Sequence, residues 1–443
     1  MKSARETALL ILYRYDKENA YLNIAFKNML ASSDFSREDT AFIKELVFGT
    51  VKYKITLDHV IRKFSSLRLK KISPYILNIL RLSAYQMLFM DKIPKSAAVN
   101  EGVKLAKKYG HSASSGFCNA VLRKISSLEE IPYPSGTVNE ALSIRYSHPL
   151  NLVDFYINTF GEEQAEKILS ANLETPPLCL RANSLMGGRN ELINSLKEEG
   201  FEAKAAPIAE SAVFVASGGD ITKSKAYKSG LFTIQDQASQ IVAAMLSPEP
   251  GNTVMDMCSA PGGKTTHIAE LMQNKGIIHA FDLYEKRLSD VKAQAERLNI
   301  NIITTKAHDA ESLLPEFENK ADRVLLDVPC SGLGIIRRKP DIKYKEDLLN
   351  FKQLVKIQKN ILNICSKYLK INGIMVYSTC TINPAENMEV IEDFLNTHKN
   401  FCIDIPDGCN FSEYAQDVLK CGFGTFLPGH SDGFFICRLR RIS

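Results

Sequence analysis

Residues 231–443 alternate short apolar segments with longer amphipathic ones, and this alternation constrains the fold more than any other feature of the chain. The short segments are TVMDMC (253–258), IIHAFD (277–282), IITTKA (302–307), RVLLDV (323–328) and GIMVYST (373–379). Helical patterns lie at 264–273, 285–299, 346–369 and 385–398. Such alternation is typical of a mostly parallel sheet with helices on both faces. The sequence therefore predicts a Rossmann-like α/β domain over residues 231–443.

Two further domains are expected before this one. Residues 1–135 carry apolar residues at intervals of three and four, as in ARETALLILYRY and YILNILRLSAYQMLFM, which predicts an all-α domain. IPYPSGT (131–137), with two prolines and a glycine, is typical of a linker. In residues 140–230, LCLRANS, FEAKAA and AVFVAS predict strands and RNELINSLKEEG predicts a helix. We therefore expect a small α+β domain over residues 140–230.

Positive charge is concentrated in the N-terminal part of the chain. Residues 1–150 contain 23 Lys and Arg against 13 Asp and Glu, a net charge of +10, whereas the remainder carries −5. A surface of this kind suits a polyanion such as nucleic acid, although solvated helical faces give the same pattern.

The composition also limits the compartment. No apolar run approaches the roughly 18 residues of a membrane-spanning helix, and ALLILY is too short for the core of a signal peptide, so we expect a cytoplasmic protein. Ten cysteines at irregular spacings, with no CxxC pair and no Cys/His cluster, predict reduced thiols and no bound metal. We expect a monomer that does not associate with membranes.

The segment TVMDMCSAPGGKTTHIAE (253–270) predicts a buried strand, a tight turn and a helix. Gly262 and Gly263 permit close backbone approach to a ligand, and the helix beginning near Lys264 presents free amides to it. A triphosphate-binding loop would need glycine at the position of Cys258, and no GxGxxG is present. The segment therefore favours a nucleoside-type ligand without a phosphate chain, and S-adenosylmethionine fits this description.

Two aspartates follow the next strands. Asp282 ends the second strand about 20 residues after the loop, where a carboxylate can accept both ribose hydroxyls. Asp309 follows the third strand and could contact the adenine amine. Either residue alone could form a turn or cap a helix, but their placement at successive strand ends favours ligand binding.

Two cysteines also follow strands, Cys330 in LLDVPCSG and Cys380 in YSTCTI. A buried cysteine is usually a core residue, but two thiols at the cofactor edge indicate chemistry. Carbon 5 of cytosine is a poor nucleophile, and a thiolate adding to carbon 6 would activate it. The second thiol, or a base beside it, would then help to remove the carbon-5 proton, and Asp327 could supply an acid at the ring nitrogen. Spacing alone does not decide which thiol attacks.

The segments DMCSAPGGKTTHIAE, LLDVPCSGLG, YSTCTINPAENMEVIEDFL and TFLPGHSDGFFICRLRR resemble the motifs of the RNA 5-methylcytosine methyltransferases. The resemblance implies that Cys380 attacks the base and that Cys330 releases the product. It also implies cofactor contacts from one loop and three aspartates: Cys258, Ser259, Ala260, Pro261, Gly262, Gly263, Lys264, Asp282, Asp309 and Asp327.

Residues 81–124 resemble the NusB-like RNA-binding domain of bacterial 16S ribosomal RNA cytosine-5 methyltransferases of the RsmB (Fmu/Sun) type. This resemblance implies 16S ribosomal RNA as the substrate, with the target cytosine in a loop or otherwise unstacked. The first two domains would bind flanking RNA. Arg181 and the basic residues Arg337, Arg338 and Lys339 are candidate RNA contacts, although an arginine on a strand is more often a solvated surface residue. We expect His267 on a helix surface.

Two alternatives remain open from the sequence. The same chemistry could act on transfer RNA, or the chain could be a non-catalytic RNA-binding assembly factor with an idle methylase fold. The intact set of Cys330, Cys380 and Asp327 beside the cofactor loop disfavours the second.

Overall fold

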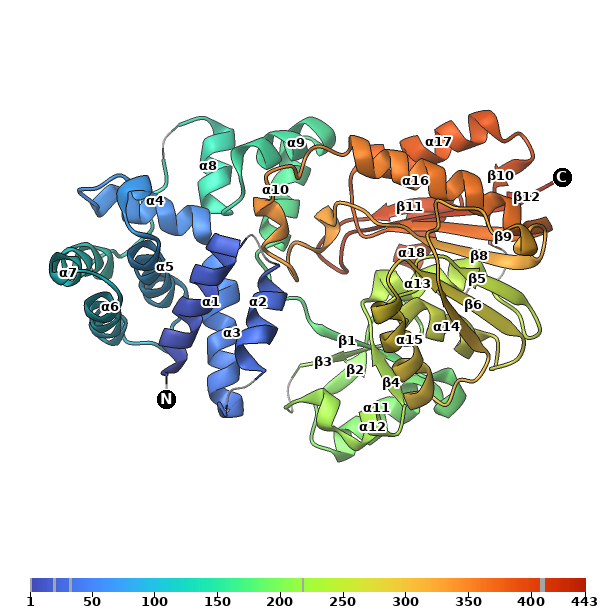
Figure 1. Cartoon of the computed structure of the whole chain (residues 1–443), viewed down its shortest axis with the longest axis horizontal. Helices are drawn as coiled ribbons and strands as arrows, with labels where there is room; N and C mark the ends of the chain where they lie inside the picture. Colours follow the sequence, from blue (N-terminus) through green and yellow to red (C-terminus); the bar gives the residue numbers. More distant parts are fainter. Residues whose placement is uncertain (1, 19–20, 32–33, 135, 217–218, 407–410) are drawn as a thin grey trace. The chain divides into compact units, whose positions relative to one another are not determined.

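The computed structural model describes residues 2–18, 21–31, 34–134, 136–216, 219–406 and 411–443. The chain forms two compact units (Figure 1). The helical unit contains Met1–Glu174 together with Ile336–Asp347, and the sheet unit contains Thr175–Ile335 together with Leu348–Ser443. The predicted linker at 131–137 includes residue 135, which lies outside the described residues, as does Cys409.

The helical unit begins with seven helices around one apolar core, as predicted for an all-α domain. They are α1 (Ala4–Glu18), α2 (Leu22–Leu30), α3 (Arg37–Lys52), α4 (Lys54–Phe64), α5 (Pro74–Phe89), α6 (Lys95–Tyr109) and α7 (Ser112–Ser126). Helix α5 starts with Pro74 after Ser73, whose hydroxyl accepts from the Ile76 amide, a favourable arrangement for a helix start. Helices α3 and α4 are separated only by Tyr53.

Three more helices complete the helical unit. They are α8 (Val138–Arg145), α9 (Leu150–Phe160) and α10 (Glu162–Ala171). Thr137 and Glu140 form a capping box that fixes the start of α8. Helices α9 and α10 and most of α8 lie inside the range 140–230 that the sequence assigned to the small α+β domain, and the domain boundaries at 135, 140, 230 and 231 stay predictions.

A segment distant in sequence, residues 336–347, packs in the helical unit. Lys343 is only 1% exposed, and its Nζ donates to the Lys52 carbonyl at 2.8 Å. The Leu22 amide donates to Asp341 at 3.2 Å. Burial lowers the pKa of Lys343 well below its ordinary value.

The sheet unit begins with a small antiparallel sheet in the order β2-β3-β1-β4. Its strands and helices are β1 (Leu178–Ala182), α11 (Gly188–Glu198), β2 (Ala203–Ala205), β3 (Ala212–Val215), α12 (Lys225–Lys228) and β4 (Phe232–Ile234). The predicted strands and helix of this region are therefore confirmed.

The remaining elements build an eight-stranded mixed sheet in the order β10-β12-β9-β8-β5-β6-β7, with β11 paired to β12. Its strands are β5 (Thr253–Asp256), β6 (Ile277–Asp282), β7 (Ile303–Ala307), β8 (Ala321–Asp327), β9 (Leu369–Thr379), β10 (Phe401–Ile403), β11 (Phe423–Phe426) and β12 (Phe434–Arg441). Strands β5 to β9 run parallel, whereas β12 is antiparallel to β9.

Helices cover both faces of this sheet, which confirms the predicted α/β class (Figure 1). They are α13 (Gln237–Leu246), α14 (Gly263–Leu271), α15 (Glu285–Arg297), α16 (Lys352–Cys365), α17 (Met388–Thr397) and α18 (Glu413–Leu419). Val254 joins a core with α13 and α14, whereas its neighbour Met255 joins a core with α16 and α17. The alternation of side chains along β5 therefore fills both layers.

The structure corrects two details of the predicted elements. The helix expected over 346–369 is α16, which spans only Lys352–Cys365, because residues 336–347 belong to the helical unit. Strands β10, β11 and β12 were not predicted. In the part of the chain that the structure describes, no helix has the length and apolar character needed to cross a membrane.

Candidate active site

The parallel strands β5, β6, β7, β8 and β9 end at one edge of the large sheet. This edge receives the loop after β5 and the two cysteine segments after β8 and β9. Asp327 ends β8 in register with Ser378 of β9, two residues before Cys380. The predicted site segments therefore meet at the sheet edge where open α/β folds bind ligands.

The loop 257–262 connects β5 to α14. The Ser259 amide donates to the Phe281 carbonyl at 2.8 Å, which fixes the loop against β6. Gly262 has φ +103°, and a Cβ there would lie 3.0 Å from the Val291 backbone of α15. Glycine is therefore required at this position both by conformation and by space. No side chain caps the start of α14, so its amides are available to a ligand.

Two buried oxygens beside this loop have no hydrogen-bond partner among the residues that the structure describes. They are Ser259 Oγ and Asp256 Oδ1, whereas Asp256 Oδ2 accepts from the Thr265 hydroxyl at 2.7 Å. Burial raises the pKa of Asp256 to about 7. Because buried polar groups are normally satisfied, these oxygens indicate a place for a polar ligand. The loop residues from Cys258 to Lys264 fit a nucleoside such as that of S-adenosylmethionine.

The two aspartates predicted for the nucleoside differ in their surroundings. Asp282 is buried at the end of β6, where it accepts from the Ala260 amide at 3.3 Å and pairs with Arg287 at 3.2 Å. It therefore lies against the loop, as a ribose-binding carboxylate should. Asp309 is exposed and accepts from the Glu311 amide at 3.0 Å, which is a turn-capping contact. Its contact with adenine stays a prediction.

The two predicted catalytic thiols are in direct contact. Sγ of Cys330 lies 3.2 Å from Sγ of Cys380, although their positions are 50 residues apart, and neither cysteine forms a disulfide. The hydrogen bond with Cys380 and burial raise the pKa of Cys330 well above its ordinary value. The thiol of Cys330 therefore keeps its proton at neutral pH.

Glu386 holds the two cysteine segments together. Its buried carboxylate accepts from the amide of Ser331 at 2.8 Å and from its hydroxyl at 2.6 Å. It also accepts from Gln358 at 3.1 Å and from Asn383 at 3.0 Å. Sequence reasoning missed this residue, although a carboxylate in INPAEN, six residues after Cys380, was the available signal.

Asp327 has two side-chain partners at the same edge. Lys264 donates to Oδ2 at 2.7 Å, and the Ser378 hydroxyl donates to Oδ1 at 2.8 Å. Lys264 Nζ also lies 5.0 Å from the centre of the Phe434 ring. The ion pair therefore joins the cofactor loop to the strand that leads into Cys330.

The structure corrects the prediction that Arg181 contacts RNA phosphate. Its side chain is 0% exposed and forms an ion pair with Glu270 of α14 at 2.7 Å. It also donates to the Thr266 hydroxyl at 3.0 Å and to the Gly263 carbonyl. No surface remains for an RNA phosphate, and the guanidinium instead ties β1 to the helix that begins at the cofactor loop.

The remaining candidates divide by exposure. Arg337 is 4% exposed, so the prediction of an RNA contact is not supported for it. Arg338 is half-buried and Lys339 is exposed, and their RNA contacts stay predictions. His267 was expected on a helix surface, but it is buried, and burial lowers its pKa well below the ordinary value. Among the described residues, no group of three His, Cys, Asp or Glu side chains could hold a metal ion.

Family models match three parts of the chain. The model described as 16S rRNA methyltransferase RsmB/F matches residues 243–440, a NusB family model matches residues 2–127, and the ferredoxin-like domain model of RsmF/B-like methyltransferases matches residues 148–222.

Two curated relatives and one solved structure cover almost the whole chain. A probable ribosomal RNA small subunit methyltransferase B from Bacillus subtilis (strain 168) is 38% identical over 99% of both chains. One from Synechocystis sp. (strain ATCC 27184 / PCC 6803 / Kazusa) is 36% identical over 100% of both. The crystal structure of PH0851 covers 100% of this chain and 99% of its own, with 25% identity and a TM-score of 0.80.

These matches confirm the predicted fold, the enzyme class and S-adenosylmethionine as the cofactor. The helical domain, the small sheet and the thiol-bearing sheet edge occur in one chain, in the order in which the family models match. The chain therefore belongs to the 16S rRNA methyltransferase RsmB/F family.

Proposed function

We propose that this protein transfers a methyl group from S-adenosylmethionine to carbon 5 of a specific cytosine in 16S ribosomal RNA. The observation that carries the proposal is the contact between the Cys330 and Cys380 sulfurs, 3.2 Å apart, at the sheet edge beside the cofactor loop. Neither an amine methylase nor an idle fold has a physical need for two touching thiols at this place. The names of the family and of its relatives support ribosomal RNA as the substrate.

Cys380 is the proposed nucleophile. Its thiolate forms a bond to carbon 6, and the electron pair of the ring double bond makes carbon 5 nucleophilic. The bound cofactor supplies the methyl group that carbon 5 then takes up. Asp327, protonated when the base binds, donates its proton to the ring nitrogen, which neutralises the negative charge that develops there during addition, and it takes the proton back as carbon 5 accepts the methyl group.

Cys330 completes the cycle. Once the sulfur of Cys380 is bonded to carbon 6, it no longer carries the charge that disfavours a Cys330 thiolate. Cys330 can then give its proton to solvent and, as a thiolate, remove the proton on carbon 5. The ring double bond reforms as the bond from carbon 6 to sulfur breaks, which releases methylated cytosine and free Cys380.

The face of the base must be accessible to Cys380, so the target cytosine is expected in a loop or unstacked. We propose that the chain acts as a monomer in the cytoplasm. The helical unit, in which residues 1–150 carry a net charge of +10, would bind flanking RNA.

Methyl transfer from labelled cofactor to 16S ribosomal RNA tests the proposal, with naked RNA and partly assembled small subunits as substrates. Mapping of 5-methylcytosine in cells with and without the protein identifies the nucleotide. The expected result is one or a few cytosines that lose methylation in 16S ribosomal RNA and depend on Cys380.

Three results would contradict the proposal. Loss of methylation only in transfer RNA would support the alternative substrate. Full turnover by the Cys380→Ala variant would exclude the thiol mechanism. Absence of product from folded, cofactor-loaded protein on all of these RNAs would favour the non-catalytic assembly factor.

A further inference from the structure

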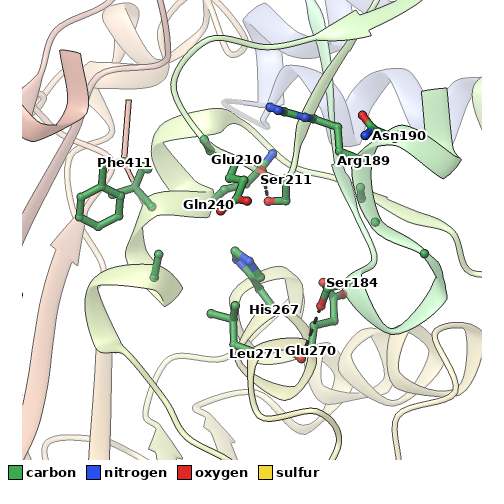
Figure 2. Close-up of a pocket in the computed structure, with 16 residues that line it drawn as sticks. Ser184, Arg189, Asn190, Glu210, Ser211, Gln240, His267, Glu270, Leu271 and Phe411 are labelled. Atoms are coloured by element: carbon green, nitrogen blue, oxygen red, sulfur yellow. Dashed lines mark hydrogen bonds between the residues drawn. The ribbon is translucent and has the colours of Figure 1, made fainter. Parts of the chain in front are cut away.

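The sheet unit contains a pocket where the small sheet meets α13 and α14 (Figure 2). Its volume is about 460 Å³, within the roughly 300–1,000 Å³ of small-molecule sites. Residues of α11 line one side, and His267 and Leu271 of α14 line another. None of the residues proposed above for methyl transfer lines this pocket.

One side of the pocket suits an anion. Helix α11 begins at Gly188 after Gly187, and no side chain caps its first turn. Arg189 lines the pocket, and its guanidinium forms no hydrogen bond or ion pair with the residues that the structure describes. Amides at the start of a helix and a nearby arginine together favour a phosphate group.

His267 supplies an independent indication of a ligand. It is 6% exposed, its Nδ1 has no hydrogen-bond partner, and Figure 2 places its imidazole in the middle of the pocket. Because burial lowers its pKa, the ring is neutral and can donate from one nitrogen and accept at the other. An unsatisfied buried nitrogen costs free energy that a polar ligand would recover.

The remaining lining combines apolar and polar groups. Ile241, Ala244 and Leu271 offer apolar contacts, whereas Gln240 and Ser211 offer hydrogen-bonding groups and bond to each other at 2.8 Å. Glu210 lies at the exposed side and can accept from a ribose hydroxyl. A flat heteroaromatic ring with a ribose and one phosphate matches this set of groups.

We propose that this pocket binds a single nucleotide, with its phosphate at Arg189 and the start of α11 and its base beside His267. The nucleotide could be free in solution or part of an RNA strand, and the second case rests on the proposed function. Arg181 links this pocket to the cofactor loop. It forms an ion pair with Glu270, which lines the pocket, and it donates to the Gly263 carbonyl of the loop.

Equilibrium titration of the full chain tests the proposal. Saturating S-adenosylhomocysteine is present throughout, so that the probes do not bind in the cofactor position, and the variants described next separate binding in this pocket from binding of a base beside Cys380. The probes are cytidine 5′-monophosphate, adenosine 5′-monophosphate, inorganic phosphate and a single-stranded RNA hexamer. We expect both nucleotides to bind more tightly than inorganic phosphate, because the base and the ribose add contacts.

Two variants locate the binding. Arg189→Gln removes a charged donor and should weaken nucleotide binding about tenfold. Lys223→Gln is the matched control, because Lys223 is exposed on the same small domain and lies outside the pocket. Ala244→Phe should fill the pocket and abolish binding. Thermal denaturation identifies any variant that fails to fold. If Ala244→Phe does not fold, the result for Arg189→Gln alone decides whether the pocket binds the nucleotide.

Each outcome either shows whether the bound nucleotide is free or part of RNA, or contradicts the proposed nucleotide pocket. Competition by the RNA hexamer, with photo-crosslinks from a thiouridine in it to residues 184–190, would assign the pocket to an RNA nucleotide. Nucleotide binding without such competition would assign it to a free nucleotide. Absence of binding, or binding that Arg189→Gln leaves unchanged, would overturn the proposal. Because methyl transfer is measured separately, its failure would leave this result intact.

Discussion

Cys330 and Cys380 are both cysteines that follow a strand, so the sequence does not distinguish their thiols. Their surroundings in the structure differ. Cys330 follows Pro329, whose carbonyl accepts from Gln358 at 2.9 Å, and precedes Ser331, which Glu386 holds. Cys380 follows Thr379 directly at the end of a buried strand. The segment of Cys330 is thus fixed by side chains, whereas Cys380 extends directly from β9 and is flanked by Thr379 and Thr381, which both bond to Asn387 at 2.6 Å and 3.0 Å.

Replacing Cys330 by alanine should trap a covalent complex between protein and RNA. Without this thiol the proton on carbon 5 is not removed, so the bond between Cys380 and carbon 6 persists. A denaturing gel should reveal a shifted RNA band that requires the cofactor. Cys421→Ala, which removes an exposed thiol, is the matched control and should give no shift. A shifted band in the Cys330→Ala, Cys380→Ala double variant would contradict the assigned roles.

Replacing Glu386 by glutamine should slow methyl transfer with little effect on cofactor binding. The carboxylate accepts four hydrogen bonds, and an amide nitrogen in its place would face a donor. We expect a loss of about 1–3 kcal/mol in the stability of this segment. Turnover should fall about tenfold for each 1.4 kcal/mol that the transition state loses. Glu389→Gln, on the exposed side of α17, is the control, and equal turnover in both variants would exclude a positioning role.

At the scale of elements, the ion pair between Arg181 and Glu270 connects the small sheet to α14. The sequence allowed a solvated strand surface for Arg181, but Cys179, Leu180 and Arg181 are all buried. A strand whose two faces are both covered can carry a charge only when the charge is paired. The partner, 89 residues away, could not be identified from one sequence.

Removing either member of this pair should destabilise the sheet unit by about 3–5 kcal/mol, because the other charge stays buried. Hydrogen exchange of β5 amides measures the change in Arg181→Met and Glu270→Met. The double variant should recover much of the loss, because two apolar side chains then face each other. If the stability lost in the double variant equals the sum of the losses in the two single variants, Arg181 and Glu270 are not energetically coupled.

The mostly parallel sheet and the loop after β5 followed from alternation and glycine placement, and the strand-end position of Cys330 and Cys380 followed from the same pattern. Their 3.2 Å contact did not, because it depends on packing between segments 50 residues apart. Strand β10 has only three residues, and β11 has four, which are too few to reveal a period. Glu386 and the buried state of His267 depend on tertiary contacts and were likewise beyond a single sequence.

At the scale of the whole molecule, the segment 336–347 departs from the order of the chain. It follows the Cys330 loop in sequence but packs in the helical unit, where Lys343 and Asp341 bond to backbone groups of that unit. Its local stability should therefore depend on helices that are about 300 residues earlier in the chain.

Destabilising the helical core should loosen this segment without loosening the large sheet. Leu46 is fully buried in that core, and Leu46→Ala should cost about 2–5 kcal/mol. Hydrogen exchange should accelerate in residues 341–345 and stay unchanged in β8. Leu362→Ala, in the core between α16 and the sheet, is the reciprocal control and should affect β8 instead. Unchanged exchange at 341–345 in Leu46→Ala would contradict this dependence.

Because the chain leaves one unit, enters the other, leaves it briefly and returns, no single proteolytic cut can yield two intact halves. A protease that cleaves near residue 174 would still leave a dozen residues of the larger fragment embedded among the helices of the smaller one. Separately expressed halves would each lack part of a fold, so gain or loss of the helical half in evolution would also require the passage 336–347 to change.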